Sequence, residues 1–310
     1  MLKKKLLKKL GLLLSCLIVV EIIILYPKEK PTISLKSEEE TGVIYLLDEN
    51  NYVARLDFMF TATSNKGKIK EIVDVLTINN HNSLKIREGF KAVIPENTKL
   101  MNIEIKKDLV NLDFSKEILN VDEKYEEKLV EALIYSITAL KDINKISLLV
   151  NGKRMEKLPH SHKKLDETLD RSYKINKEYD LKSMHNISEV TIYYLAKKND
   201  YLYYIPVTKY TNNEKEKVEI IIDELKSSST YKANLISYIN EETQLINYEL
   251  LDKSLILNFN EQILSDINSS NIIEEVTYAI NLSVQENYDI DNVSYSINDN
   301  IISNYFLLLG

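Results

Sequence analysis

The stretch LVNLDFSKEIL, from Leu109 to Leu119, returns about 145 residues later as LILNFNEQIL, from Leu255 to Leu264. Aligned without gaps, residues 97–119 and 242–264 are identical at 8 of 23 positions. Both stretches alternate apolar residues up to a phenylalanine, which indicates a strand with one buried face. A single repeat at this spacing predicts two duplicated domains, because a solenoid would repeat every ~20–50 residues.

The similarity extends upstream of these strands. Ile44–Leu47 and Ile192–Leu195 each begin an apolar run that a polar turn separates from a second run, which is typical of a β-hairpin. A helix follows in each copy, with apolar residues at positions i, i+3, i+4 and i+7. These residues are Ile69, Ile72, Val73 and Leu76 in the first copy, and Val218, Ile221, Ile222 and Leu225 in the second.

A second helix and a last strand are predicted downstream in each copy. Asp122 is a candidate cap for the helix of the first copy, and Asn271 with Glu274 resembles a capping box in the second. The buried stripe of the first of these helices is predicted to be Leu129, Leu133, Ile137 and Leu140. The last strands begin at Lys145 and Asn292, and residues 301–309 are expected to close the second sheet.

The element order in each copy is therefore β-β-α-β-β-α-β. We expect an α+β protein with two tandem domains, each a mixed β-sheet with two helices packed on one face, after an N-terminal transmembrane helix. The first repeat covers residues 43–158 and the second covers residues 188–310, with a polar linker over residues 159–187.

The N-terminus predicts attachment to a membrane. A basic tail (residues 1–9) precedes an apolar run (residues 10–26) of about 25 Å if helical, and a charged tether (residues 27–42) follows. The lysines favour a cytoplasmic start, which places the body outside the cell membrane as a single-pass protein. Three alternatives are a lipoprotein cleaved before Cys16, the only cysteine, a buried N-terminal helix of a cytoplasmic protein, and a cleaved secretory signal, although no small-x-small site precedes Pro27.

Charge and composition exclude several classes of function. The whole chain has a net charge of −7, and residues 1–30 carry a net charge of +5. The remaining residues therefore carry a net charge of −12. An acidic body is a poor partner for nucleic acid, whose phosphates are neutralised by Lys and Arg. The scattered glycines build no phosphate-binding loop, and we expect no cofactor.

Four motifs of the first repeat resemble the GerMN family, the sporulation and spore germination domain: VIYLLDEN (43–50), VIPENTKL (93–100), VNLDFS (110–115) and ISLLVNGK (146–153). The second repeat adds IPVTK (205–209) and INEETQL (239–245). The resemblance implies a membrane-attached protein that faces outward in a Gram-positive-type envelope, with a role in sporulation, germination or peptidoglycan assembly. It brings no established catalytic residues.

Two groups of ionisable residues are candidates for a catalytic or a metal site. Asp113 and Glu117 could form an acid–base pair, but the second repeat has Asn258 and Gln262 in their places, which favours turn hydrogen bonds over proton transfer. His160 and His162 could ligate a metal with His185 or Asp166, but no HExxH motif or cysteine pair accompanies them. We therefore expect neither catalytic nor metal-binding residues.

The tyrosine-rich hairpin of the second repeat is the candidate partner-binding surface. Alternation places Tyr201 and Tyr203 on one face and Tyr204 on the other, so that one face is core and the other is free for a protein strand or a glycan. High β-propensity and codon bias also explain the tyrosines. The expected function is a non-enzymatic scaffold that binds envelope or spore-assembly proteins, and the alternatives are a peptidoglycan-acting enzyme and a passive glycan- or ligand-binding module.

Overall fold

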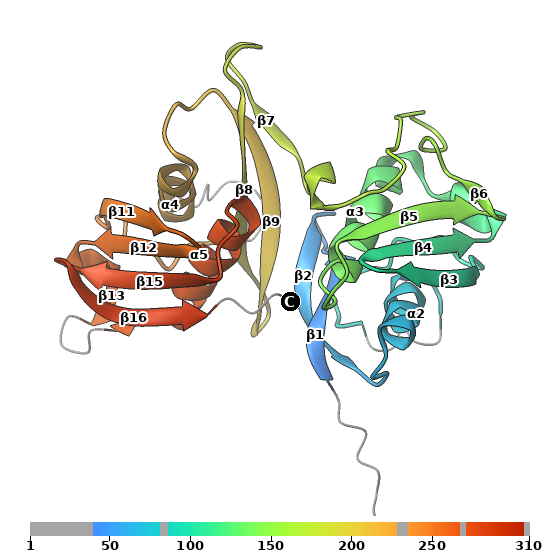
Figure 1. The fold of residues 1–310 in the computed structure, drawn as a ribbon, viewed down its shortest axis with the longest axis horizontal. Helices are drawn as coiled ribbons and strands as arrows, with labels where there is room; N and C mark the ends of the chain where they lie inside the picture. The colour runs from blue at the N-terminus through green and yellow to red at the C-terminus, as the bar shows by residue number, and fades with distance from the viewer. Residues whose placement is uncertain (1–39, 81–85, 228–234, 267–270, 307–310) are drawn as a thin grey trace, which may run out of the picture. The chain divides into compact units, whose positions relative to one another are not determined.

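The computed structural model describes residues 40–80, 86–227, 235–266 and 271–306 (Figure 1). The predicted basic tail, the anchor with Cys16 and the tether up to residue 39 lie outside the described residues. None of the helices in the described ranges is both long and apolar enough to cross a membrane.

The first repeat has the predicted order of elements. It consists of β1 (Glu40–Leu47), β2 (Val53–Phe60), α2 (Asn65–Leu76), β3 (Leu100–Lys106), β4 (Leu109–Phe114), α3 (Glu126–Ile137), β5 (Lys145–Val150) and a short β6 (Lys153–Arg154). The side chains of Val110, Leu112 and Phe114 are fully buried, which confirms the strand with one buried face. Asp122 accepts a hydrogen bond from the Lys124 amide and caps the 3-10 turn that precedes α3.

The second repeat follows the same order with additional short strands. It consists of β8 (Ser188–Lys198), β9 (Tyr201–Thr211), α4 (Lys217–Ser227), β10 (Leu235–Ile236), β11 (Leu245–Leu251), β12 (Ser254–Phe259), β13 (Leu264–Asp266), β14 (Asn271–Ile272), α5 (Glu274–Asn287), β15 (Asn292–Ile297) and β16 (Asn300–Phe306). The strand β16 pairs with β15, so residues 300–306 close the second sheet, while residues 307–309 lie outside the described residues. The predicted capping box is wrong, because Asn271 pairs in β14 and Ile273 precedes α5 without a side-chain cap.

The sheets differ from the prediction of one sheet per repeat. Each repeat keeps a four-stranded mixed sheet, β3-β4-β5-β6 or β11-β12-β15-β16, in which one pair, β4 with β5 or β12 with β15, is parallel. The hairpins β1-β2 and β8-β9 separate from these sheets and join each other in a sheet of order β1-β2-β9-β8-β10. The contact between the repeats in this sheet is the antiparallel pair Arg55 and Tyr204.

Burial of α3 on nearly all sides explains why the hairpin leaves the sheet. Ten of the twelve residues of α3 are buried, including Val130, Ile134 and Tyr135, which lie outside the predicted stripe. A helix whose apolar residues lie on more than one side needs other elements packed against each of those sides. The helix α3 packs against β1 and also against β5, so it lies between two sheets instead of on one face of a single sheet (Figure 1).

Residues of the predicted linker contribute to this packing. Leu165, Leu169 and Ile175 are buried, and β7 (Glu178–Asp180) pairs with the end of β9 in parallel. The segment also forms a bridge between Leu169 and Ile146 at the start of β5. The chain between the repeats is therefore part of the folded body.

Candidate functional site

The duplicated pair Asp113 and Asn258 has the role that the substitution predicted. The Asp113 carboxylate accepts a hydrogen bond from the Gly152 amide at 2.8 Å, in the turn after β5. Asn258 accepts one from the Asp299 amide at 3.2 Å, in the corresponding turn after β15. Aspartate and asparagine are interchangeable here because an amide oxygen accepts the same bond. Glu117 lies on the surface, where hydrogen bonding to Ser115 lowers its pKa.

The two histidines of the linker do not come together as a site. His160 Nε2 lies 2.7 Å from the Val121 carbonyl oxygen, while His162 is exposed with a left-handed φ of 56°. The carboxylate of Glu126 accepts hydrogen bonds from the backbone amides of His160 and Ser161, both at 2.9 Å. Within the described ranges, His, Cys, Asp and Glu side chains form no group of three or more that could hold a metal ion.

The tyrosine-rich hairpin is partly covered on both faces, and of its three candidate residues only Tyr203 is buried. Tyr203 is 4% exposed, and its hydroxyl donates to buried Asp48 at 3.4 Å. Tyr204 is half-buried against Tyr278, with the ring centroids 5.0 Å apart. Tyr201 is half-buried under the Arg87 guanidinium, which lies 4.2 Å from its ring centroid. The alternation prediction assumed one free face, but β9 also carries the contact between the repeats, and so Tyr203 is not available to a partner.

A buried polar cluster that the sequence analysis missed connects the repeats. We call it the joint: Tyr45 of β1, Tyr135 of α3, Arg171 of the linker, Tyr193 of β8 and Glu286 of α5. The Glu286 carboxylate accepts a hydrogen bond from the Arg171 guanidinium at 2.7 Å. It also accepts hydrogen bonds from the hydroxyls of Tyr135 and Tyr193, at 3.1 and 3.2 Å. The hydroxyls of Tyr45 and Tyr193 lie 3.3 Å apart.

The joint combines repeated and unrepeated residues. Tyr45 and Tyr193 occupy equivalent strand positions, and their backbone amides donate at 2.9 Å to equivalent helix serines, Ser136 and Ser283. Arg171 and Glu286 have no counterpart in this pattern. They supply opposite charges where the two tyrosines meet, so they fix the repeats in one relative orientation.

Burial determines the protonation of the joint. It raises the pKa of Tyr135 and of Tyr193 well above the usual value of 10, and the negative charge of Glu286 adds to this increase. Both hydroxyls therefore stay protonated and act as donors at neutral pH. A carboxylate that accepts one guanidinium and two hydroxyls is well solvated by the protein, which supports a structural role.

Asn176 of the linker completes the contact between the two hairpins. Its side-chain oxygen accepts the Val53 amide at 2.9 Å, and its nitrogen donates to the carbonyls of Val53 at 2.9 Å and Pro206 at 2.6 Å. Pro206 has no N–H, so β9 cannot continue its ladder with β2 at this point. The amide of Asn176 satisfies the backbone groups that the proline leaves without a strand partner.

One signal in the sequence could have located the joint. Only four of the forty basic residues are arginine, at positions 55, 87, 154 and 171. Arg171 bonds Glu286, and Arg55 lies over the Tyr278 ring, 5.3 Å from its centroid. A chain that otherwise uses lysine retains arginine where a planar group must stack or bond in two directions.

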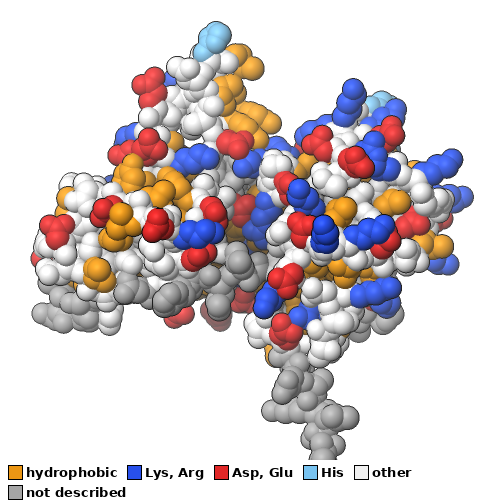
Figure 2. Space-filling model, viewed as in Figure 1, with side chains coloured by type: hydrophobic (Ala, Val, Ile, Leu, Met, Phe, Trp, Pro, Cys, Tyr) orange, Lys and Arg blue, Asp and Glu red, His pale blue; other side chains and the backbone are white. Residues whose placement is uncertain are grey.

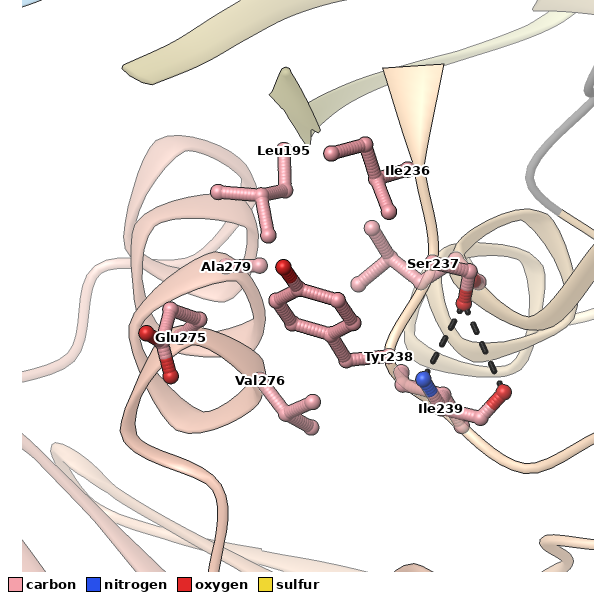
Figure 3. Close-up of a pocket in the computed structure, with 9 residues that line it drawn as sticks. Leu195, Ile236, Ser237, Tyr238, Ile239, Glu275, Val276 and Ala279 are labelled. Atoms are coloured by element: carbon pink, nitrogen blue, oxygen red, sulfur yellow. Dashed lines mark hydrogen bonds between the residues drawn. The ribbon is translucent and has the colours of Figure 1, made fainter. Parts of the chain in front are cut away.

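A shallow pocket lies between α4, β8 and α5 (Figure 3). Leu195, Ile236, Val276 and Ala279 form its apolar wall, and the ring of Tyr238 lies across it. The space at its centre is about 10 Å³, which is room for about one water molecule. Binding pockets for small molecules are typically about 300–1,000 Å³, so this pocket does not fit a sugar or a peptide side chain.

Comparisons with known proteins agree with the duplicated architecture. Residues 43–156 match the Germane family model, described as sporulation and spore germination. The chain is 30% identical over 256 residues to the spore germination protein GerM of Bacillus subtilis (strain 168), covering 80% of this chain and 68% of that protein. The solved tandem GerMN domains of the sporulation protein GerM from B. subtilis superpose with a TM-score of 0.76 at 28% identity, covering 84% of this chain and 92% of that structure.

Proposed function

This chain belongs to the GerMN family of sporulation and spore germination proteins, and from that premise we propose that it is a non-enzymatic scaffold of the cell envelope. In this proposal residues 10–26 anchor it in the cell membrane, and its two repeats lie outside the cytoplasm. There they bind proteins of the spore-assembly or envelope machinery.

The observation that carries the proposal is the joint. A scaffold holds its partners at defined positions, so its two binding domains need a fixed relative orientation. The ion pair of half-buried Arg171 with Glu286 supplies that orientation, together with three tyrosine hydroxyls and the strand pair between β2 and β9. Arg171 and Glu286 are thereby engaged in holding the repeats together.

The role of Asp113 supports a scaffold over a peptidoglycan-acting enzyme. Its carboxylate is bound to a turn amide, and the second repeat performs the same task with an uncharged residue. A general acid or base must exchange a proton, which Asn258 cannot do.

Two experiments on the full chain test the proposal. In the first experiment, cells that produce the full chain are fractionated, and the intact chain is expected in the membrane fraction. A variant in which a cleavable secretion signal replaces residues 1–26 is expected in the soluble extracytoplasmic fraction. Labelling of Cys16 with a radioactive fatty acid would instead support the lipoprotein alternative.

The second experiment separates a scaffold from an enzyme. The purified chain is incubated with cell-wall sacculi, and released fragments are measured by chromatography. We expect no release above a heat-inactivated control. Release that disappears in the Asp113→Asn variant would overturn the non-enzymatic proposal, since that substitution keeps the turn hydrogen bond.

A further inference from the structure

The strand β11 is an open edge of the second repeat. Among the described residues it pairs only with β12, and six of its seven residues are exposed. Ile246, Tyr248, Leu250 and Leu251 have exposed fractions of 51, 37, 49 and 50%. Hydrophobic side chains reach the surface over this part of the sheet (Figure 2). An edge strand directs alternate backbone N–H and C=O groups away from its sheet, where they can pair with another strand.

The equivalent edge of the first repeat, β3, has five exposed residues but differs from β11 in carrying an ion pair and a packed helix. In β3, Glu104 and Lys106 form an ion pair at 2.8 Å, and Ile103 is buried. The helix α2 also packs against β3. Charged side chains and helix cover are the usual means by which proteins block an edge. Neither a lysine nor an arginine occurs in β11, so the two repeats differ at the same position of the same fold.

The register of β11 defines what a complementary strand must carry. Tyr248 and Leu250 pair with Leu257 and Leu255, so they share the apolar face of the sheet, whereas Glu249 lies on the opposite face. An added strand would therefore place apolar residues beside Tyr248 and Leu250. The residues that alternate with these along the added strand would lie beside Glu249.

Glu249 gives β11 a negative charge on the face opposite Tyr248 and Leu250, and glutamates that alternate with Lys215 and Lys217 lie at the start of α4. Tyr248 lies close to the start of α4, where burial and then the charges of Glu216 and Glu219 raise its pKa. A strand with lysine or arginine at alternate positions complements this surface, whereas an acidic strand is repelled.

We propose that β11 accepts an extended segment of a partner protein as an added strand, and that this segment alternates apolar residues with lysine or arginine. The proposal rests on the scaffold function and identifies the surface and the chemistry of one of its partners. Backbone hydrogen bonds supply affinity in this mode of recognition, and the alternating side chains supply specificity.

The test uses a short synthetic peptide in which Lys alternates with Val and Ile, and the full chain in non-ionic detergent. Binding is followed by fluorescence anisotropy, and amide hydrogen exchange locates the bound peptide. We expect slower exchange at residues 245–251 and unchanged exchange at residues 100–106. A peptide with Glu in place of Lys is expected to bind more weakly by a factor of about ten or more, because it faces like charges.

Matched variants examine the edge itself. Leu250→Lys places a charge on the apolar face of β11 and is expected to weaken binding about tenfold or more. Ile105→Lys, the equivalent change in β3, is expected to leave binding unchanged. Both positions are exposed, and equal urea midpoints would verify that both variants fold. Binding that Leu250→Lys does not weaken, or exchange protection away from β11, would overturn the proposal.

Two further outcomes separate this proposal from its alternatives. Concentration-dependent association of the chain that Leu250→Lys abolishes would mean that a second copy occupies β11, which contradicts the proposal of a different partner. A photo-crosslinker at Asn247 of β11 in living cells is expected to capture a partner through a lysine- or arginine-rich strand. Capture from Asn102 of β3 but not from Asn247 would refute the role of β11 while leaving the scaffold function intact.

Discussion

Replacing Glu286 by glutamine is expected to destabilise the whole body. The substitution keeps the size of the side chain but removes its charge, so Arg171 loses its partner in a site where Glu286 is only 6% exposed. Breaking a buried ion pair from one side typically costs about 3–5 kcal/mol. Because Arg171 keeps 31% of its side-chain exposure, we expect the lower end, about 3 kcal/mol.

Urea unfolding followed by circular dichroism measures this change. With a slope of about 3 kcal/mol per M, the loss moves the midpoint down by about 1 M. Glu274→Gln is the matched control, because Glu274 is exposed on the same helix, and a change of no more than about 0.5 kcal/mol is expected there.

A double-mutant cycle then tests whether the effect belongs to the ion pair. Arg171→Met removes the other charge, and the double variant is expected to lose less stability than the sum of the single variants, with a coupling of about 1–3 kcal/mol. A Glu286→Gln midpoint equal to that of the control, together with a coupling near zero, would refute the role assigned to the joint.

Three other expectations concern single groups. Asp113→Ala is expected to cost about 1 kcal/mol by leaving the Gly152 amide without its acceptor, whereas Asp113→Asn stays near the wild type in the same urea assay. Burial alone would raise the pKa of Glu126, but hydrogen bonds from residues 160–161 hold this pKa below its usual value. The contribution of Glu126 to stability is therefore present above the unfolded pKa and is lost as pH falls through the folded pKa. In an acid titration of stability, the Glu126→Gln variant is expected to show a smaller loss. The raised pKa values of Tyr135 and Tyr193 act in the opposite range: stability is full below pH ~10 and falls above it by about 1.4 kcal/mol per pH unit for each tyrosine, and unfolding midpoints at alkaline pH that do not fall would contradict this assignment.

Local patterns were sufficient to predict the elements of each repeat. The stripes of α2 and α4 are buried as their spacing predicted, and the strands β4 and β12 lie where alternation up to a phenylalanine placed them. The replacement of Asp113 by Asn258 also predicted a turn hydrogen bond correctly. These features depend on residues close together in the sequence, where periodicity and side-chain chemistry are visible directly.

Local patterns predicted wrongly where a second surface packs against the residues concerned. Tyr203 was a candidate for partner binding, but it is 4% exposed and its hydroxyl bonds Asp48 of the first repeat. The Asn271 capping box was expected from four residues alone, but a two-residue strand pair with β13 uses Asn271 instead. In both places a contact from elsewhere in the fold outweighs the local preference.

The sequence by itself determined that the chain is a duplicated α+β protein, because local periodicity reveals the same order of strands and helices in both copies. Its short motifs, not this periodicity, carried the resemblance to the GerMN family. Only the tertiary structure decided that the two hairpins share a sheet and that Arg171 and Glu286 meet between them. These residues are 115 positions apart, and nothing in their own neighbourhoods specifies their partner. Their contact arises when both repeats have folded and bury the surfaces that each leaves uncovered.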